Sequence, residues 1–325
     1  MTVWVLRLTI MRLAFVLLLS TASFAQNKAS DAHPVVGMLN FIHAVSNLER
    51  SIVFYTEVFG LEKPAPPRPP NAAVPALIGV PGALLRVAVF RIPGASFGLE
   101  VTDFGGIERH PAEPRLTDPG AAYLTFQVRD IAPVFAALKK AGAVIVTRSG
   151  GLVNGSIFVR DPDGYLIEVR QVAPADDAPK GNVVGAVMGV TVRDMDSTVK
   201  FYRAMLGFEL TGTMDFASNP AIADLAGSVQ YRRITGNVPG TNSRIGFWEF
   251  KGVDRTPFHG RVPDPGTPAI ALRVTGLDAV LKRLKASGVT VVSTGGEPAQ
   301  FSPTIRNVFI EDPSGFKIEL FETSQ

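Results

Sequence analysis

The chain contains one sequence pattern twice, and this internal repeat limits the possible folds more than any other feature. The segment from His43 to Glu62 resembles the segment from Val190 to Glu209, which begins 147 residues later. The turn at Asp161 returns at Asp312, 151 residues further on. Self-similarity of this kind indicates a duplicated structural unit. The two halves of the chain are therefore predicted to share one fold.

Each half divides again into two similar modules. In the first module an apolar strand leads into a helix that Asn47 caps and Gly60 ends. In the second module Asp130 caps the helix and Gly142 ends it. Strand-like runs follow each helix, so the order strand, helix, strand, strand, strand occurs four times. This order predicts an α+β fold of four βαβββ modules.

The N-terminal residues 1–25 are predicted to be a secretory signal peptide. Arg7 and Arg12 precede the apolar run Leu13–Ser20, and the small residues before Ala25 suit cleavage. A membrane anchor is less favoured, because the run is shorter than the roughly 20 residues that a span needs. The chain can start at Met1 or at Met11. We expect an exported protein, periplasmic or secreted, with no membrane contact after cleavage.

Charge and cysteine content exclude several classes of function. The formal net charge of +3 falls to +1 without the two arginines of the signal peptide. Nucleic-acid binding needs a clustered basic face, so no nucleic-acid partner is expected. The chain has no cysteine, which excludes disulfides and thiolate metal sites. The expected partner is a small molecule, and the sequence leaves both a monomer and a homodimer open.

The helix entry VSNLERSIVFYTEVFGLE and the closing hairpin DPDGYLIEV resemble the vicinal oxygen chelate superfamily. This superfamily includes glyoxalase I, extradiol dioxygenases and bleomycin-binding proteins. The resemblance implies that two modules pair into a cupped sheet, which gives two glyoxalase-like domains. The first is predicted to span residues 36–172 and the second residues 183–323, with residues 173–182 as a linker.

The resemblance also implies that each cup places four side chains, from the first and fourth strands of its two modules, around one divalent metal ion. The positions predicted for the first cup are Asn40, Glu100, Tyr123 and Glu168. Those predicted for the second cup are Val187, Gly246, Ala269 and Glu319. Valine, glycine and alanine side chains cannot ligate a metal. The second site is therefore predicted to be degenerate, and Glu319 to be a relic.

The first cup allows several kinds of chemistry. Asn40, Glu100 and Glu168 offer oxygen ligands, which suit Mg²⁺, Mn²⁺ or Ca²⁺ better than Zn²⁺ or Fe²⁺. A site without metal is an equal alternative. Glu100 and Glu168, with Tyr123, are also candidate catalytic residues, because two carboxylates across a cavity can act as acid and base. The remaining interpretation is that Glu100 and Glu168 are structural, as buried carboxylates that accept hydrogen bonds.

Two further features bear on the cups. His43 lies three residues from Asn40, so strand alternation predicts that it points to the opposite face, as a satisfied core histidine. The long apolar segments around Pro75 and Pro220 are predicted to form a wall over the cup or to pack the domains together.

The sequence thus predicts an exported glyoxalase-like or dioxygenase-like protein with a depleted set of metal ligands. If it is an enzyme, the resemblance implies a lyase or a dioxygenase. It would act in the first cup on a small apolar or aromatic molecule. The alternative is a non-catalytic protein of the bleomycin-resistance type that binds or sequesters a small molecule.

Overall fold

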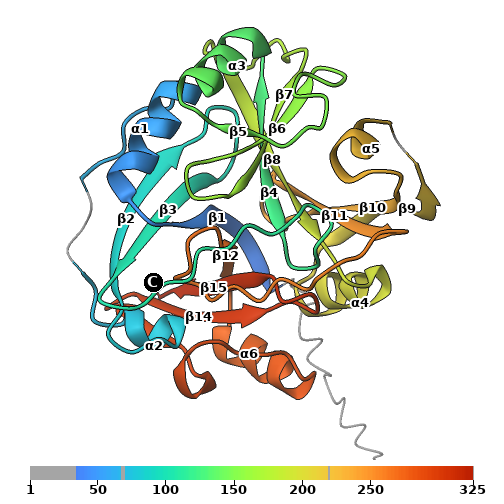
Figure 1. The fold of residues 1–325 in the computed structure, drawn as a ribbon. Coiled ribbons are helices and arrows are strands. Elements are labelled where there is room, and N and C mark those ends of the chain that lie inside the picture. Colours follow the sequence, from blue (N-terminus) through green and yellow to red (C-terminus); the bar gives the residue numbers. More distant parts are fainter. Residues whose placement is uncertain (1–33, 67–69, 219, 325) are drawn as a thin grey trace, which may run out of the picture. The chain divides into compact units, whose positions relative to one another are not determined.

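The computed structural model describes residues 34–66, 70–218 and 220–324. The predicted signal peptide lies outside these residues. None of the helices in the described part is long and apolar enough to cross a membrane. The described chain forms two mixed sheets with helices packed against them (Figure 1).

Sheet A has seven strands in the order β13-β14-β15-β12-β1-β3-β2. Its strands are β1 (Val35–Val45), β2 (Leu84–Arg91), β3 (Gly98–Gly105), β12 (Pro268–Val274), β13 (Ala299–Ser302), β14 (Ile305–Glu311) and β15 (Lys317–Thr323). The central pair, β1 and β12, is antiparallel, and each of these strands has a parallel neighbour, β3 or β15.

Sheet B has eight strands in the order β5-β6-β7-β4-β8-β11-β10-β9. Its strands are β4 (Ala122–Val128), β5 (Val144–Ile145), β6 (Ser156–Arg160), β7 (Leu166–Gln171), β8 (Val183–Thr191), β9 (Glu209–Ala217), β10 (Gln230–Asn237) and β11 (Arg244–Lys251). The antiparallel pair β4 and β8 has the central place that β1 and β12 have in sheet A.

The helices are α1 (Leu48–Phe59), α2 (Val74–Ile78), α3 (Ile131–Lys140), α4 (Met195–Lys200), the π-helix η1 (Phe201–Met205), α5 (Pro220–Ala226), α6 (Leu277–Ala286) and the 3₁₀ turn η2 (Thr294–Gly296). The helices α1 and α3 begin and end at the residues that the sequence predicts. Asn47 accepts a hydrogen bond from the first turn of α1, and Gly60 ends that helix with a left-handed backbone. Asp130 caps α3 in the same way, which confirms both predicted caps.

The pairing of the modules differs from the prediction. Sheet A joins the first module to the fourth, and sheet B joins the second to the third. The expectation that consecutive modules share a cup is therefore wrong. The segment predicted as a linker between domains instead joins β7 to β8, two strands of the same sheet. The four modules are alike in sequence, so repeat spacing cannot tell which pairs share a sheet.

Strand alternation sorts β1 into two faces. Phe41 and Val45 belong to the main hydrophobic core, together with Leu48 and Tyr55 of α1. Ile42 and Ala44 belong to a separate cluster with Leu77 of α2. Because side chains alternate along a strand, Asn40 shares the face of Ile42, and His43 lies on the helix side. The predicted orientation of His43 is confirmed.

The connecting segments of the two halves brace each other. Asp118 accepts a hydrogen bond of 2.9 Å from the backbone N–H of Thr256, and Asp264 accepts one of 2.9 Å from that of His110. Each aspartate is also paired, at 2.8 Å, with the arginine three residues before it in the chain. These reciprocal contacts fix the two segments to one another.

Candidate functional site

Two glutamates from different modules meet on one face of sheet A. Glu100 lies on β3 beside Ile42 of β1, and Glu319 lies on β15 beside Ala271 of β12. The sequence assigned these glutamates to separate cups, and the exchanged pairing of modules brings them together. We call this surface the carboxylate face of sheet A.

An asparagine amide holds each of these carboxylates. The Nδ2 of Asn40 donates to Oε2 of Glu100 at 2.6 Å, and the Nδ2 of Asn307 donates to Oε1 of Glu319 at 2.6 Å. Asn307 was not among the predicted site residues. Asn307 is the single amide among apolar residues in the centre of β14. Strand alternation places it facing inward, and this feature of the sequence could have identified it as a site residue.

The electrostatics of the pair favour the protonated state. Burial raises the pKa of Glu100, although the hydrogen bond from Asn40 opposes this. Burial and the negative charge of Glu100 together raise the pKa of Glu319 to about 8, against the hydrogen bond from Asn307. Near neutral pH, one carboxyl of the pair can therefore carry a proton while the other is ionised.

Apolar side chains surround the carboxylate face. The strands contribute aliphatic side chains and one aromatic ring, and α2 adds three aliphatic side chains; they include Ile42, Ala44, Ala269, Ala271, Phe309, Val74, Leu77 and Ile78. Helix α2 is fixed from the side of the fourth module, where Ser293 Oγ donates to the carbonyl oxygen of Leu77 at 2.5 Å. The prediction of an apolar wall over the cup is confirmed for the segment around Pro75, which forms this helix.

The ligand set on this face does not fit a four-ligand metal ion. Ala269 occupies one of the four positions and has no donor atom. The Asn40 amide and the Asn307 amide present nitrogen, and not oxygen, to Glu100 and Glu319. Only the two carboxylates remain as ligands, and within the described part of the chain they join no group of three histidine or carboxylate ligands.

Glu168, which the sequence favoured, has a different environment in sheet B. Its Oε1 accepts from Ser156 Oγ at 2.6 Å and from Arg170 Nη2 at 2.5 Å, and its Oε2 accepts from Thr125 Oγ1 at 2.7 Å. The carboxylate is 2% exposed. A buried carboxylate with three side-chain donors, one of them a cation, has the bonding of a structural residue.

The other predicted positions in sheet B contribute no further ligand. Tyr123 packs on Phe158, and burial together with the charge of Glu168 raises its pKa well above the usual range. Val187 pairs with Thr125 across β4 and β8, and Gly246 lies next to Gly189. Aromatic and aliphatic side chains fill this face, among them Trp248, Phe250 and Ile222 of α5.

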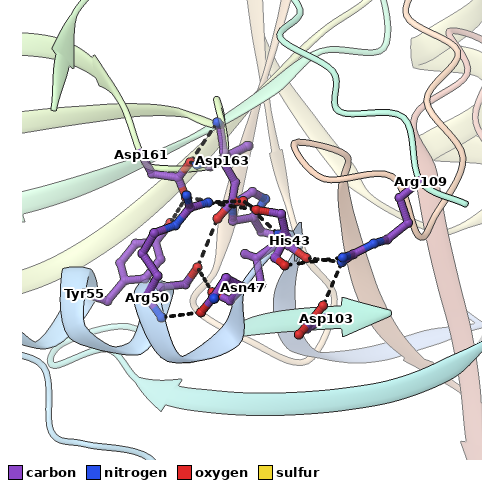
Figure 2. A network of polar contacts seen from close by, with 12 residues as sticks. His43, Asn47, Arg50, Tyr55, Asp103, Arg109, Asp161 and Asp163 are labelled. Carbon is purple, nitrogen blue, oxygen red and sulfur yellow. Dashed lines mark hydrogen bonds and ion pairs between the residues drawn. The ribbon is translucent and has the colours of Figure 1, made fainter. Parts of the chain in front are cut away.

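A second polar cluster joins the first module to the closing turn of the second (Figure 2). His43 Nε2 lies 2.7 Å from Asp161 Oδ2, and both side chains are fully buried. Tyr55 donates to the same oxygen at 2.9 Å. Asp163 Oδ1 accepts from Arg50 Nη2 at 2.7 Å and from the backbone N–H of Ser46 at 2.8 Å.

This cluster could bind a metal ion, because ligand atoms of His43, Asp161 and Asp163 all lie within 4.8 Å of one another. In the structure, however, they bond to protein groups. Both oxygens of Asp161 accept hydrogen bonds, Oδ1 from the backbone N–H groups of Asp163 and Tyr165. Burial alone would raise the pKa of Asp161, but the charge and hydrogen bond of His43 lower it overall. The expectation of a satisfied histidine holds for Nε2 alone, because Nδ1 is buried without a hydrogen-bond partner among the described residues.

The fold and the site together define a class of protein. Four related modules form two mixed sheets, of which the first module contributes three strands and each of the others four, and the last strand of three modules carries a glutamate, Glu100, Glu168 or Glu319. A model of the Glyoxalase/Bleomycin resistance protein/Dioxygenase superfamily matches residues 38–169 and 184–320. The chain therefore belongs to this superfamily, as two tandem segments.

Individual relatives agree with this assignment. The chain is 28% identical over 185 residues to a lactoylglutathione lyase of Oryza sativa subsp. japonica, and 28% identical over 177 residues to one of Arabidopsis thaliana. These matches cover 55% and 53% of this chain and 56% and 55% of the relatives, so the chain spans about half the length of each.

Solved structures show the same fold. Glyoxalase I from Zea mays superposes with a TM-score of 0.55 at 21% identity, covering 88% of this chain and 92% of that one. A putative dioxygenase from Bacillus subtilis gives a TM-score of 0.54 at 14% identity, covering 90% of this chain and 87% of that one.

Proposed function

We propose that this protein is an exported glyoxalase-family enzyme that moves a proton on a small apolar or aromatic carbonyl compound at the Glu100–Glu319 pair. The observation that carries the proposal is the pair itself: two carboxyls from different modules, each held by one amide and each with a raised pKa. One ionised and one protonated carboxyl are the groups that general base and general acid catalysis require.

The reaction follows from these two groups. The ionised carboxylate takes a proton from the carbon next to the carbonyl group. The protonated carboxyl gives its proton to the carbonyl oxygen, which forms an enol. Return of a proton to the same carbon, with the enol proton going back to the carboxylate, restores the carbonyl compound and exchanges its C–H with solvent. Where the substrate carries a hydroxyl on that carbon, the enediol can instead take the proton at the former carbonyl carbon while the hydroxyl gives its proton to the carboxylate, which moves the carbonyl group with no net change in electrons or atoms. The apolar side chains of Leu77 and Phe309 lie in the cluster beside the pair and suit an apolar substrate.

A second candidate is a binding protein without catalysis. It is favoured by the way α2 packs its side chains into the cluster on the carboxylate face, since a filled face leaves little room for a reaction. The family includes bleomycin resistance proteins as well as enzymes. In this case, the raised pKa values would only reflect the cost of burying carboxylates.

Deuterium exchange separates the two candidates. The mature protein would be incubated in D₂O with 1-phenylpropan-2-one or with the hemithioacetal of methylglyoxal and glutathione. We expect NMR to show catalysed exchange of the acidic C–H, and the second substrate also tests the activity for which the plant relatives are named. Glu100→Gln and Glu319→Gln should each lower the rate about 100-fold or more, which is the usual contribution of a general acid or base.

Glu168→Gln is the matched control, because Glu168 has the equivalent place in the other sheet but is bonded to Arg170. We expect it to keep the exchange rate of the parent protein, provided that circular dichroism shows it folded. No exchange with either compound, together with binding of 1-phenylpropan-2-one that both Glu→Gln variants retain, would instead support the binding protein.

Two parts of the proposal need separate tests. N-terminal sequencing of the protein recovered outside the cytoplasm should begin just after Ala25, and a mature chain that keeps Arg12 would contradict export by this signal. Elemental analysis should find no stoichiometric metal ion whose binding depends on Glu100 and Glu319. A Mg²⁺, Mn²⁺ or Ca²⁺ ion that both Glu→Gln variants lose would contradict proton transfer by the pair alone.

A further inference from the structure

A cavity of about 560 Å³ lies at the corner between the helix of the third module and the closing turn of the fourth. Its volume is within the range of small-molecule sites. It is separate from the carboxylate face, since it is bounded by α4, η1 and the turn after β14. The side chains that matter here are Arg193, Lys200, Phe201, Met205, His259 and Val289.

In the first half of the chain, two ion pairs bridge the same corner. There, Arg50 reaches from α1 to Asp163 in the turn of the second module, and His43 is bonded to Asp161 (Figure 2). The repeat places Ser197 where Arg50 stands, Ser314 where Asp163 stands and Val190 where His43 stands. The second corner therefore lacks both ion pairs that bridge the first.

The backbone of the two corners is nevertheless the same. The N–H of Arg193 donates to Ser314 Oγ at 3.0 Å, as the N–H of Ser46 donates to Asp163. Tyr202 donates to Asp312 at 3.2 Å, as Tyr55 donates to Asp161. The difference in cavity follows from the side chains and from the helix, which continues as the π-helix η1. Such π-helical turns are frequent at functional sites.

The cavity has a cationic part and an apolar part. Among the described residues, the side chains of Arg193 and Lys200 form no ion pair, and both are exposed at the cavity. His259 lies beside the turn at Gly315. Two carboxylates also line the cavity: Glu311, which is paired with Lys317 at 2.6 Å, and the buried Asp312, which accepts hydrogen bonds from Tyr202 and from two backbone N–H groups. The apolar part consists of Phe201, Met205 and Val289.

We propose that this corner is a second ligand site, which binds a small organic anion with an apolar body. Arg193 and Lys200 bind the anionic group, with His259 at the edge of the site, and Phe201 and Met205 contact the apolar body. Charge-assisted hydrogen bonds from an arginine and a lysine are the strong contacts for a carboxylate, sulfonate or phosphate group. The ligand would bind independently of the Glu100–Glu319 pair.

The test uses a pair of fluorescent probes that differ in charge. 8-Anilinonaphthalene-1-sulfonate has an aromatic body and one sulfonate, and N-phenyl-1-naphthylamine has a similar body without the charge. We expect the sulfonate to bind the full mature protein at one saturable site, at least tenfold more tightly than the neutral probe. The double variant Arg193→Ala/Lys200→Ala should abolish this difference, and Lys140→Ala, on the exposed surface of α3, should not.

A second variant closes the cavity with the residues of the first corner. Ser197→Arg/Ser314→Asp restores the ion pair that Arg50 and Asp163 make, so the protein should remain folded, with a melting temperature no lower than that of the parent. We expect it to lose the sulfonate site. Unchanged binding in this variant, or equal affinity for the charged and neutral probes in the parent, would overturn the proposal.

Discussion

Replacing His43 with valine is expected to destabilise the protein by about 3–5 kcal/mol at pH 7.5, the usual cost of removing one partner of a buried ion pair. The variant leaves Asp161 fully buried with Tyr55 and two backbone N–H groups as its remaining donors. Valine is the residue that the second half of the chain has at this place, Val190. The free energy of unfolding, measured in urea, checks the prediction.

The second half of the chain shows how the pKa of an equivalent aspartate shifts when it has no histidine partner. Asp312 has the equivalent place without a histidine, and burial raises its pKa to about 6 despite its hydrogen bonds. In the parent protein the pKa of Asp161 is lowered, so its ionised form stabilises the fold above the unfolded pKa near 4. In the variant the pKa of Asp161 should rise, and the cost should shrink as the pH falls below about 6.

The double variant His43→Val/Asp161→Asn provides the control. It removes the uncompensated carboxylate and leaves an amide oxygen for the two backbone donors, so it should be more stable than His43→Val alone. If His43→Val unfolds at the same urea concentration as the parent at pH 7.5, the pair does not stabilise the fold. If the cost is the same at pH 5, the carboxylate is not its cause.

Replacing Glu319 with glutamine is expected to stabilise the protein at high pH. The pKa of Glu319 is raised to about 8 in the fold, so the folded state binds a proton that the unfolded state releases above its pKa near 4.5. The stability of the parent should therefore fall as the pH rises from about 5 to about 8. Glutamine carries no charge and can still accept the hydrogen bond from Asn307.

The expected gain is on the order of 2–3 kcal/mol at pH 9 and near zero at pH 5. This gain is smaller than the full pKa shift of Glu319 implies, for two reasons. The side chain keeps some exposed surface, and part of the shift comes from the negative charge of Glu100. Urea unfolding at both pH values measures it.

Glu168→Gln should instead destabilise the protein, since it removes the partner of Arg170. A Glu319→Gln variant that is less stable than the parent at pH 9 would show that the ionised pair is not costly to the fold.

Local structure followed from the sequence because short-range chemistry determines it. Asn47 and Gly60 bound α1 where a cap and a left-handed residue were expected. The alternation of β1 placed His43 opposite Asn40 without knowledge of the neighbouring strands. The segment around Pro75 was expected to be apolar and to cover the sheet, and its side chains pack on Ile42 and Ala269.

The candidate site did not follow, because it depends on long-range pairing between modules with equivalent edges. The sequence prediction grouped Glu319 with Val187 and Gly246, which cannot ligate a metal, so Glu319 was interpreted as a relic. In the structure Glu319 lies in the same sheet as Glu100, and burial together with the charge of Glu100 raises its pKa. Glu168, the favoured candidate, instead bonds to Arg170, Ser156 and Thr125 of its own module, and residue type alone does not predict these partners. The sequence placed glutamates on the last strands of three modules but could not show which of these strands meet.

The antiparallel contacts of β1 with β12 and of β4 with β8 have a consequence for the chain as a whole. A half-length chain that ends near residue 175 would contain β1 and β4 but neither of their central partners. Both strands would then present unsatisfied edges, and a second half-length chain would be needed to cover them. The full chain can thus be described as a dimer of half-chains joined covalently, in which the peptide link replaces association and allows the two halves to diverge. The two halves have diverged at the Glu100–Glu319 pair in sheet A. They have also diverged at the two corners, of which the first is bridged by ion pairs and the second contains the cavity.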